Sequence, residues 1–261
     1  MLPAERLESI KAFIDQEGTV NISELTDRFQ VSKPTVLRDL KELEKQEMII
    51  RVHGGAKSKR SIQTNFEPVH FMKEKEAVSE KEAIAGMAMS HIHAGETILL
   101  DSGSTTLALA RKMASLRDIT VITNDMKNAM VLSDNDAIDL VVIGGQKRKG
   151  VYSLNGPFAE DMLKQLHVDK VFLGTDAIDF KSGLTNSNID ETNVKKAMID
   201  AARETILLAD RSKFHKVAFT KVANVKALNR IITNELVAEA DLKRYNDLGI
   251  TVETKETDEM E

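Results

Sequence analysis

The 261-residue sequence predicts an α/β protein in two parts: a small N-terminal part made mainly of helices, and a larger part built on a mostly parallel sheet. In the first sixty residues, apolar side chains recur at helical spacing. From Ser79 onward, short β-branched runs alternate with helical segments, which is the pattern of a parallel sheet with crossover helices. Hydrophobic residues make up 42% of the chain, enough to bury a sizeable core.

Composition excludes several classes of protein. The sequence has no cysteine, which leaves no disulfide framework and no thiolate metal site. It begins MLPAERLESI, without the basic and apolar regions of a signal peptide, and no apolar run is long enough to span a bilayer. We therefore expect a soluble, cytoplasmic protein with no membrane partner, no metal ion and no cofactor.

The charge is unevenly distributed along the chain. The net charge is −5, which argues against a general polyanion binder. Residues 1–60, however, hold 11 Lys and Arg against 10 Asp and Glu, and residues 48–60 hold four cations and no acid. A locally basic segment on an acidic chain indicates a module that faces an anion.

Three helices are predicted in the first sixty residues. Apolar spacing predicts a helix over 4–16 that ends near Gly18. Asn21 is the expected N-cap of the second helix, and Glu24 completes a capping box. Ser32 is the expected N-cap of the third. Two helices joined by a few residues, the second polar on its outer face, indicate a helix-turn-helix.

The third helix is expected to bury Val36, Leu40 and Leu43, and to face solvent with a basic surface. A β-prone run over 48–52 and a Gly-Gly turn follow, so the unit is a winged helix-turn-helix. In such a unit, cations read guanine or neutralise phosphate, and hydroxyls donate to phosphate oxygens. The residues expected to bind duplex DNA are Ser32, Lys33, Thr35, Arg38, Lys41, Arg51 and His53. For the helix alone, a merely solvated face is the alternative.

Residues 31–56, VSKPTVLRDLKELEKQEMIIRVHGGA, resemble the signature of the DeoR family of transcriptional regulators, roughly V-S-x-x-T-[IV]-R-R-D-L-x-x-L-E-x-x-G-x-[IL]-x-R-x-H-G-G-A. The resemblance implies binding to operator DNA and argues against the solvated-face interpretation. Two positions depart from the signature. Leu37 replaces the first of two arginines, which removes one potential DNA contact, and Glu47 replaces a glycine in the turn that leads to the wing.

The domain organisation follows from changes in composition. Residues 58–78 are mostly polar and predict a linker between the winged unit, 1–57, and a Rossmann-like α/β domain, 79–253. Ser79 is the expected N-cap of the first helix of this domain. Strands are expected at 97–101, 119–123, 138–144, 170–174, 205–209 and 230–233. The acidic end, 254–261, is expected to be a disordered tail.

The loop after the first of these strands is the strongest candidate for a ligand site, because ligands of parallel sheets bind at the carboxyl ends of strands. The loop combines hydroxyls, a glycine and a helix N-terminus, which suit an anionic group, most often phosphate. Its residues are Asp101, Ser102, Gly103, Ser104, Thr105 and Thr106. It is neither a Walker A loop nor a dinucleotide fingerprint, and structural capping of the helix is the alternative.

Other predicted strands also end in polar residues, as at Asn124, and here the sequence resembles the DeoR-family sensor domain, which is similar to ribose-5-phosphate isomerase. The matching stretches are LLDSGSTT, VITND, VIGG, VFLGTDAID, GLTNSNIDETNVKKAMI and LLADRSKF. The resemblance implies that the DSGSTT loop holds a phosphate, and that Asp176, Glu191, Lys195 and Lys213 line the sugar end of the pocket. For each residue, an N-cap or a surface ion pair is the alternative.

Three functions compete: a regulator that binds a sugar phosphate, an active isomerase with a DNA-binding head, and an architectural DNA binder whose α/β part only dimerises. Isomerisation needs a base and acids, which Glu191 and Lys213 could supply. The isomerase carries D-G-A-D, however, and the counterpart Leu173–Asp176 keeps one aspartate, which favours binding without turnover.

We therefore expect a regulator that is not an enzyme. The family resemblance implies a repressor of a sugar-metabolism operon, released from its operator by a phosphorylated sugar. Because winged-helix regulators of this kind read paired half-sites, we expect a homo-oligomer, a dimer or a tetramer.

Overall fold

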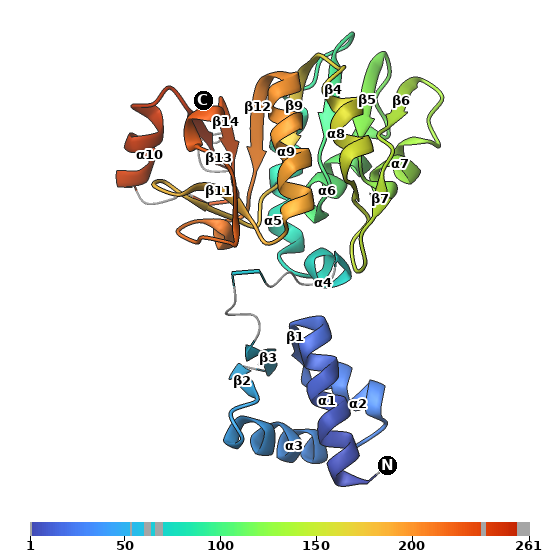
Figure 1. Ribbon diagram of the computed structural model, residues 1–261, viewed down its shortest axis with the longest axis vertical. Coiled ribbons are helices and arrows are strands. Elements are labelled where there is room, and N and C mark those ends of the chain that lie inside the picture. The colour runs from blue at the N-terminus through green and yellow to red at the C-terminus, as the bar shows by residue number, and fades with distance from the viewer. Residues whose placement is uncertain (1, 53, 60–63, 66–69, 236–238, 255–261) are drawn as a thin grey trace. The chain divides into compact units, whose positions relative to one another are not determined.

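The computed structural model describes residues 2–52, 54–59, 64–65, 70–235 and 239–254. The chain divides into two compact units, residues 1–73 and 74–261 (Figure 1). The domain boundaries drawn from the sequence stay predictions, and the expected tail lies outside the described residues except for Thr254, which is buried. No described helix is long and apolar enough to cross a membrane.

The N-terminal unit contains three helices, α1 (Pro3–Glu17), α2 (Ile22–Phe29) and α3 (Lys33–Lys45), as predicted. An antiparallel sheet of order β1-β3-β2 completes it, from β1 (Thr19–Asn21), β2 (Ile49–Val52) and β3 (Gly55–Ser58). The wing is formed by β2 and β3. Only β2 and the following turn were predicted, because β1 and β3 are too short to show an alternating pattern.

The capping box at the start of α2 is confirmed. Oδ1 of Asn21 accepts a hydrogen bond from the backbone N–H of Glu24 at 2.8 Å, and Oε2 of Glu24 accepts one from the backbone N–H of Asn21 at 3.0 Å. Ser32 occupies the N-cap position of α3, but its hydroxyl bonds the hydroxyl of Thr35 at 2.9 Å and makes no capping bond to the backbone. Ser32 therefore caps α3 by position only.

The orientation of α3 is fixed by packing and by one ion pair. Its predicted inward residues, Val36, Leu40 and Leu43, are buried. Asp39 is buried too, and its carboxylate accepts hydrogen bonds from Nε and Nη2 of Arg6 on α1 at 2.6 and 3.1 Å. A bidentate pair of this kind restricts both distance and angle, so α1 holds α3 with its polar face turned outward.

The wing depends on a close approach of two strands. A Cβ atom at position 55 would lie 2.0 Å from the carbonyl oxygen of Val20, so only glycine fits between β1 and β3 there. The preceding Gly54 has a φ of 83°, a left-handed conformation that glycine adopts without a steric penalty. These two constraints account for the Gly-Gly pair in the wing.

Glu47 occupies a position that favours glycine. The N–H of Met48 donates to the carbonyl of Leu43 and the N–H of Glu47 donates to the carbonyl of Glu44, both at 2.9 Å, so α3 ends in a Schellman motif. Glu47 has a φ of 55°, which is unfavourable for residues with a Cβ atom. The departure from the family signature thus preserves the turn at a cost in stability.

The C-terminal unit is built on a seven-stranded sheet of order β15-β14-β12-β9-β4-β5-β6, in which every pairing is parallel. The strands are β4 (Thr97–Leu100), β5 (Ile119–Thr123), β6 (Ile138–Val142), β9 (Val168–Leu173), β12 (Ala202–Leu208), β14 (Arg230–Ile232) and β15 (Thr251–Glu253). The six predicted strands and the parallel sheet are confirmed. The short edge strand β15 was missed.

Helices cover both faces of this sheet, and α8 and α9 lie in front of it in Figure 1. One face is covered by α5 (Val78–Met89), α6 (Ser104–Met113) and α7 (Met126–Leu132), and the other by α8 (Pro157–Leu163) and α9 (Ile189–Ala201). Successive strand residues point to opposite faces: Leu99 packs with α8 and α9, whereas Leu100 packs with α5 and α6. Burial on both faces explains the nearly continuous apolar strands.

After the wing, the chain also contains several smaller elements outside the seven-stranded sheet and its covering helices. They are β7 (Gln146–Lys147) paired with β8 (Leu154–Asn155), the antiparallel sheet of β10 (Ala177–Asp179), β11 (Gly183–Asn186) and β13 (Thr220–Ala223), the 3-10 turns η2 (Arg211–Lys213) and η3 (Val225–Ala227), and the helices α4 (His70–Lys75) and α10 (Glu239–Asn246). The sequence analysis did not predict the strands among them, because each has two to four residues.

The predicted N-cap of α5 is wrong. The helix begins at Val78, and Ala77, with a φ of 49°, stands at the cap position. Ser79 lies inside the first turn, where its hydroxyl bonds Oε2 of Glu80 at 3.0 Å. The capping pattern in the sequence failed because the chain enters α5 through a left-handed residue just after α4.

We expect Glu47→Gly to stabilise the N-terminal unit by about 1 kcal/mol, because glycine removes the left-handed strain of roughly 1–2 kcal/mol and loses part of that gain in backbone entropy. Slower amide hydrogen exchange in peptides from α3 and the wing would measure it. Glu44→Gly, inside α3, is the matched control and should have the opposite sign. Equal effects of both variants would contradict the strain argument.

Candidate functional site

The outer surface of α3 carries most of the residues predicted to bind DNA. Lys33, Arg38 and Lys41 are exposed, and Thr35 is half-buried beside exposed Ser32. Arg51 lies half-buried in β2, where its Nε has no hydrogen-bond partner among the described residues. His53 lies outside the described residues. A helix with a buried apolar face and an exposed cationic one can enter the major groove of DNA.

The carboxyl edge of the large sheet brings together polar residues that are far apart in the sequence. Asp101 follows β4 and is buried, and its Oδ2 binds Nζ of Lys195 on α9. The same Oδ2 accepts the backbone N–H of Gly174, which follows β9, at 2.8 Å, and Lys195 donates to the carbonyl of Gly174 at 2.9 Å. The sequence analysis placed Asp101 and Lys195 in one site, and the structure shows them in direct contact.

A second buried carboxylate, that of Glu191, lies one turn earlier on α9. Its Oε1 accepts the hydroxyl of Ser153 at 2.8 Å and lies 2.6 Å from Nη1 of Arg148, and its Oε2 accepts Nδ2 of Asn186 at 3.2 Å. Arg148 and Ser153 belong to the β7–β8 hairpin, residues 146–155. Glu191 therefore joins three elements at the same edge of the sheet: α9, the hairpin and the end of β11.

The hairpin is also attached to the DSGSTT loop. The hydroxyl of Ser102 donates to Oδ2 of Asp125 at 2.6 Å, and Oδ1 of Asp125 caps α7. Asp125 in turn forms an antiparallel bridge with Ser153. The two clusters, one around Asp101 and one around Glu191, are thus parts of one connected site.

The N-terminus of α6 is the part of this site suited to an anion. The helix starts at Ser104, and its first intrahelical hydrogen bond runs from the N–H of Leu107 to the carbonyl of Gly103 at 2.9 Å. The preceding N–H groups have no intrahelical acceptor, as in any helix. Ser104 and Thr105 are half-exposed, whereas Thr106 is buried and bonds the carbonyl of Gly103. Backbone donors without an intrahelical acceptor and two partly exposed hydroxyls therefore lie together at this end of the helix.

Two further predicted residues lie at the same edge of the sheet. Asp176 follows β9, and its Oδ2 accepts the backbone N–H of Ser187 at 2.9 Å. Lys213 is half-buried in η2, beyond the end of β12, and its ammonium forms no ion pair with any residue that the structure describes. Asp210 caps η2 through its side chain and sets the position of Lys213.

Three buried carboxamides at this edge have an oxygen without a hydrogen-bond donor among the described residues: Oδ1 of Asn124, Oδ1 of Asn128, whose Nδ2 donates to the carbonyl of Asp101, and Oδ1 of Asn155. Nδ2 of Asn124 donates to the carbonyl of Leu154 at 3.1 Å, which fixes the orientation of that amide because a carbonyl can only accept. A buried acceptor without a donor is unfavourable, so the site has room in its hydrogen bonding for a hydroxyl or a water molecule.

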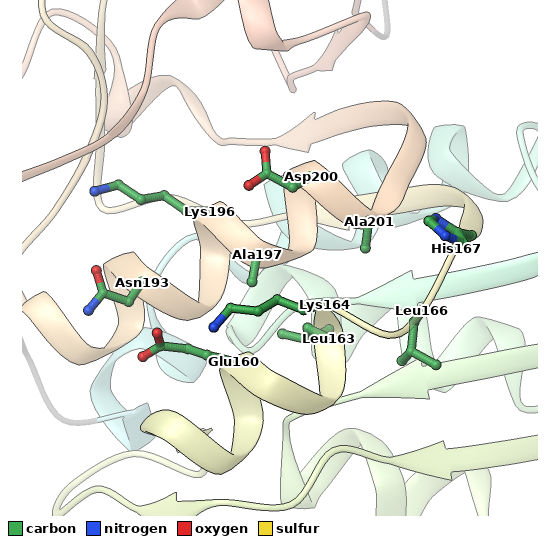
Figure 2. A pocket seen from close by; sticks show the side chains of 10 residues that line it. All are labelled: Glu160, Leu163, Lys164, Leu166, His167, Asn193, Lys196, Ala197, Asp200 and Ala201. Atoms are coloured by element: carbon green, nitrogen blue, oxygen red, sulfur yellow. The ribbon is translucent and has the colours of Figure 1, made fainter.

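A surface cleft of about 410 Å³ lies elsewhere, between α8 and α9 (Figure 2). Its floor is apolar and its rim carries charges of both signs, and it contains none of the residues predicted to bind the effector. It is lined by Glu160, Leu163, Lys164, Leu166, His167, Asn193, Lys196, Ala197, Asp200 and Ala201. In the described part of the chain, no group of three His, Asp or Glu residues is arranged to hold a metal ion.

Several residues of the connected site were not selected from the sequence: Asp125, Arg148, Ser153, Asn155 and Asn186. Asp125 stands beside the predicted Asn124, and Gly144 and Gly145 before the hairpin belong to VIGG, one of the stretches that resemble the family's sensor domain. The hairpin itself gave no signal, because its strands have two residues each. The glycine at its base was a usable hint: a Cβ at Gly145 would lie 2.7 Å from the carbonyl oxygen of Asn155.

An exposed basic recognition helix, combined with a separate α/β domain that carries a polar, anion-suited sheet edge, defines a ligand-controlled DNA-binding regulator. Residues 6–62 match the family model of the DeoR-like helix-turn-helix domain, and residues 76–235 match that of the DeoR C terminal sensor domain. The chain belongs to the DeoR family of transcriptional regulators, and it is a regulator rather than an enzyme.

The chain is similar along its whole length to bacterial regulators. It is 36% identical to the uncharacterized HTH-type transcriptional regulator YulB of Bacillus subtilis (strain 168), over 97% of this chain and 96% of the relative. It is 33% identical to the HTH-type transcriptional repressor GlcR of the same organism, over 99% of each. Ribose 5-phosphate isomerase A of Methanocaldococcus jannaschii matches 51% of this chain and 53% of its own, at 22% identity and a TM-score of 0.38.

We expect Lys195→Met to destabilise the C-terminal unit by about 3–5 kcal/mol, because it leaves the buried carboxylate of Asp101 without its cation. Urea unfolding followed by circular dichroism measures the change. Lys196→Met is the matched control: Lys196 is the next residue on α9 and is exposed, so its loss should cost less than about 0.5 kcal/mol. Asp101→Asn combined with Lys195→Met should recover part of the loss. If Lys195→Met and Lys196→Met were equally stable, the argument would be refuted.

Proposed function

We propose that this protein is a repressor of genes for sugar metabolism, and that a phosphorylated sugar bound at the carboxyl edge of the large sheet releases it from operator DNA. The observation that carries the proposal is the connected site. In it, backbone donors at the N-terminus of α6 adjoin buried polar groups from α9, the β7–β8 hairpin, the start of α7 and the end of β11. The match to a sensor domain supports control by a ligand, and similarity to a protein named a repressor supports repression.

The N-terminal unit binds operator DNA through α3. Arg38 and Lys41 are exposed on its outer face, and the hydroxyls of Ser32 and Thr35 stand at its N-terminus. Arginine can read guanine through two hydrogen bonds, while lysine and the hydroxyls hold phosphates. Arg51 on the wing adds a cation from a second element. Because Leu37 replaces one arginine of the signature, Arg38 carries the larger share of base recognition.

The effector binds with its phosphate at the N-terminus of α6 and its hydroxyls toward the other strand ends. Backbone N–H groups and the helix dipole favour an anion there. Oδ1 of Asn124, which lacks a donor among the described residues, suits a sugar hydroxyl. Asp176 and Lys213 lie at the same edge and complete the candidate set. Lys195 acts indirectly, because its ammonium already holds Asp101 and the carbonyl of Gly174.

The regulator works as a homo-oligomer, a dimer or a tetramer, in the cytoplasm, where its DNA target lies. Two heads are needed to read paired half-sites, whose separation is set by the turn of the DNA helix. Effector binding changes the fraction of molecules whose N-terminal units stand at the separation of the two half-sites. By linkage, operator DNA changes the affinity for effector by the same factor as effector changes the affinity for DNA.

Arg38→Ala should weaken operator binding by about 1–3 kcal/mol and relax specificity at one base position. Fluorescence anisotropy on DNA selected from a random library by the wild-type protein measures both. Arg203→Ala removes the same side chain from an exposed position of the C-terminal unit, 85% accessible, and should leave binding unchanged. If both variants bind like the wild type, Arg38 does not contact the operator.

A thermal-shift screen with sugar phosphates should identify an effector, since a ligand at 100 times its dissociation constant adds about 2.7 kcal/mol of stability. Ser104→Glu places a carboxylate where the phosphate is expected, so it should abolish the shift while preserving α6, because an acid suits a helix N-terminus. Ser79→Glu in the first turn of α5 is the control. A normal shift in Ser104→Glu would exclude this position for the phosphate.

A further inference from the structure

The side chain of Arg148 is partly buried, although its two neighbours in the sequence are exposed. In the β7–β8 hairpin, the adjacent Lys147 and Lys149 are exposed, whereas the side chain of Arg148 is 18% exposed. Its Nη1 lies 2.6 Å from Oε1 of Glu191, and Glu191 also accepts hydrogen bonds from Ser153 and Asn186. The carboxylate is thus held from several directions, and it holds the guanidinium at the carboxyl edge of the sheet.

The side chains around the DSGSTT loop do not by themselves favour an anion. Asp101 and Asp125 place two carboxylates beside the loop, and Lys195 supplies one ammonium, which binds Asp101. The N-terminus of α6 contributes the equivalent of about half a positive charge. A phosphate monoester carries about −1.5 to −2 at pH 7, so a phosphate in this loop needs further positive charge, of which Lys213 at the same edge of the sheet can supply one unit.

Arg148 is joined to the loop by a continuous series of contacts. Ser102 bonds Asp125, Asp125 bridges to Ser153, and Ser153 bonds Glu191, which holds Arg148. Lys127, two residues after Asp125, is paired elsewhere, because its ammonium binds Glu74. A guanidinium has five N–H donors in a fixed planar fork, so it can bind a carboxylate along one edge and two phosphate oxygens along another.

We propose that Arg148 binds the anionic phosphate group of the effector from the hairpin side, and that Glu191 is a positioning residue which holds the guanidinium there. The inference rests on the proposed function, because it assigns a further contact in the same site. It gives the selectivity for phosphorylated over free sugars to a residue outside the DSGSTT loop. It also changes the expected role of Glu191 from a sugar contact to a support for Arg148.

The test compares four full-length proteins by isothermal titration with glucose 6-phosphate, ribose 5-phosphate, inorganic phosphate and the two unphosphorylated sugars. Arg148→Gln should weaken binding of the phosphorylated ligands at least about tenfold. Arg148→Lys should give an intermediate loss, because it keeps the charge without the fork. Lys149→Gln removes the neighbouring exposed charge and should bind like the wild type. Affinity for free sugars should not change with Arg148.

A double variant, Arg148→Gln with Glu191→Gln, guards against misfolding, since it leaves no unpaired carboxylate; it should melt like the wild type and still fail to bind phosphate groups. Equal affinities of Arg148→Gln and the wild type would overturn the inference and leave the proposed function standing. An equal loss in Lys149→Gln would overturn it as well, by showing a general charge effect. If the wild-type protein binds none of the phosphorylated probes, both proposals fail together.

Discussion

The buried ion pair between Asp101 and Lys195 is the interaction on which the connected site at the carboxyl edge of the large sheet depends. It joins the end of β4 to α9, and both partners also bond Gly174 at the end of β9. Three elements from distant parts of the chain therefore meet at one pair of charges. Such a pair contributes little net stability, because desolvation offsets attraction, but loss of either partner is costly. The pair holds the first residue of the DSGSTT loop, which leads into α6, against α9 and the end of β9.

The same edge of the sheet repeats this arrangement one helical turn away. Glu191 faces Arg148 as Lys195 faces Asp101, and both pairs use a residue of α9. The sign is reversed: α9 supplies the cation to the loop after β4 and the carboxylate to the hairpin. Within these two pairs each charge is matched, whereas Asp125 is held by the hydroxyl of Ser102 and backbone N–H groups, so a phosphate must compete with carboxylates already in place.

Most of the fold could be predicted from the sequence, and the site only in part. Six apolar strands and the helices between them follow from periodicity, and the parallel sheet brings Asp101, Asn124 and Asp176 to one edge. The sequence could not show that Lys195 is buried against Asp101, since Glu191 and Lys195 at i, i+4 also suit an exposed pair. Arg148 was missed because its hairpin is held by tertiary contacts, not by local propensity. In the N-terminal unit, the turn after α3 forms although Glu47 stands where glycine is favoured, because the packing of α3 outweighs the strain at one residue.

The contacts around α7 connect the proposed effector site to α4, where the chain enters the C-terminal unit. Lys127 lies in the first turn of α7, two residues after Asp125; its ammonium binds Glu74 of α4 and lies 4.6 Å from the ring centroid of Tyr152 in the hairpin. The backbone of Tyr152 also accepts the N–H of Met126. Any movement of the hairpin would therefore be passed to Lys127, and through it to the place where the chain enters the C-terminal unit. A ligand can only move this equilibrium by binding one arrangement of the hairpin more tightly than the other. The hairpin, which touches both Glu191 and Lys127, is the element where such a difference in affinity can arise.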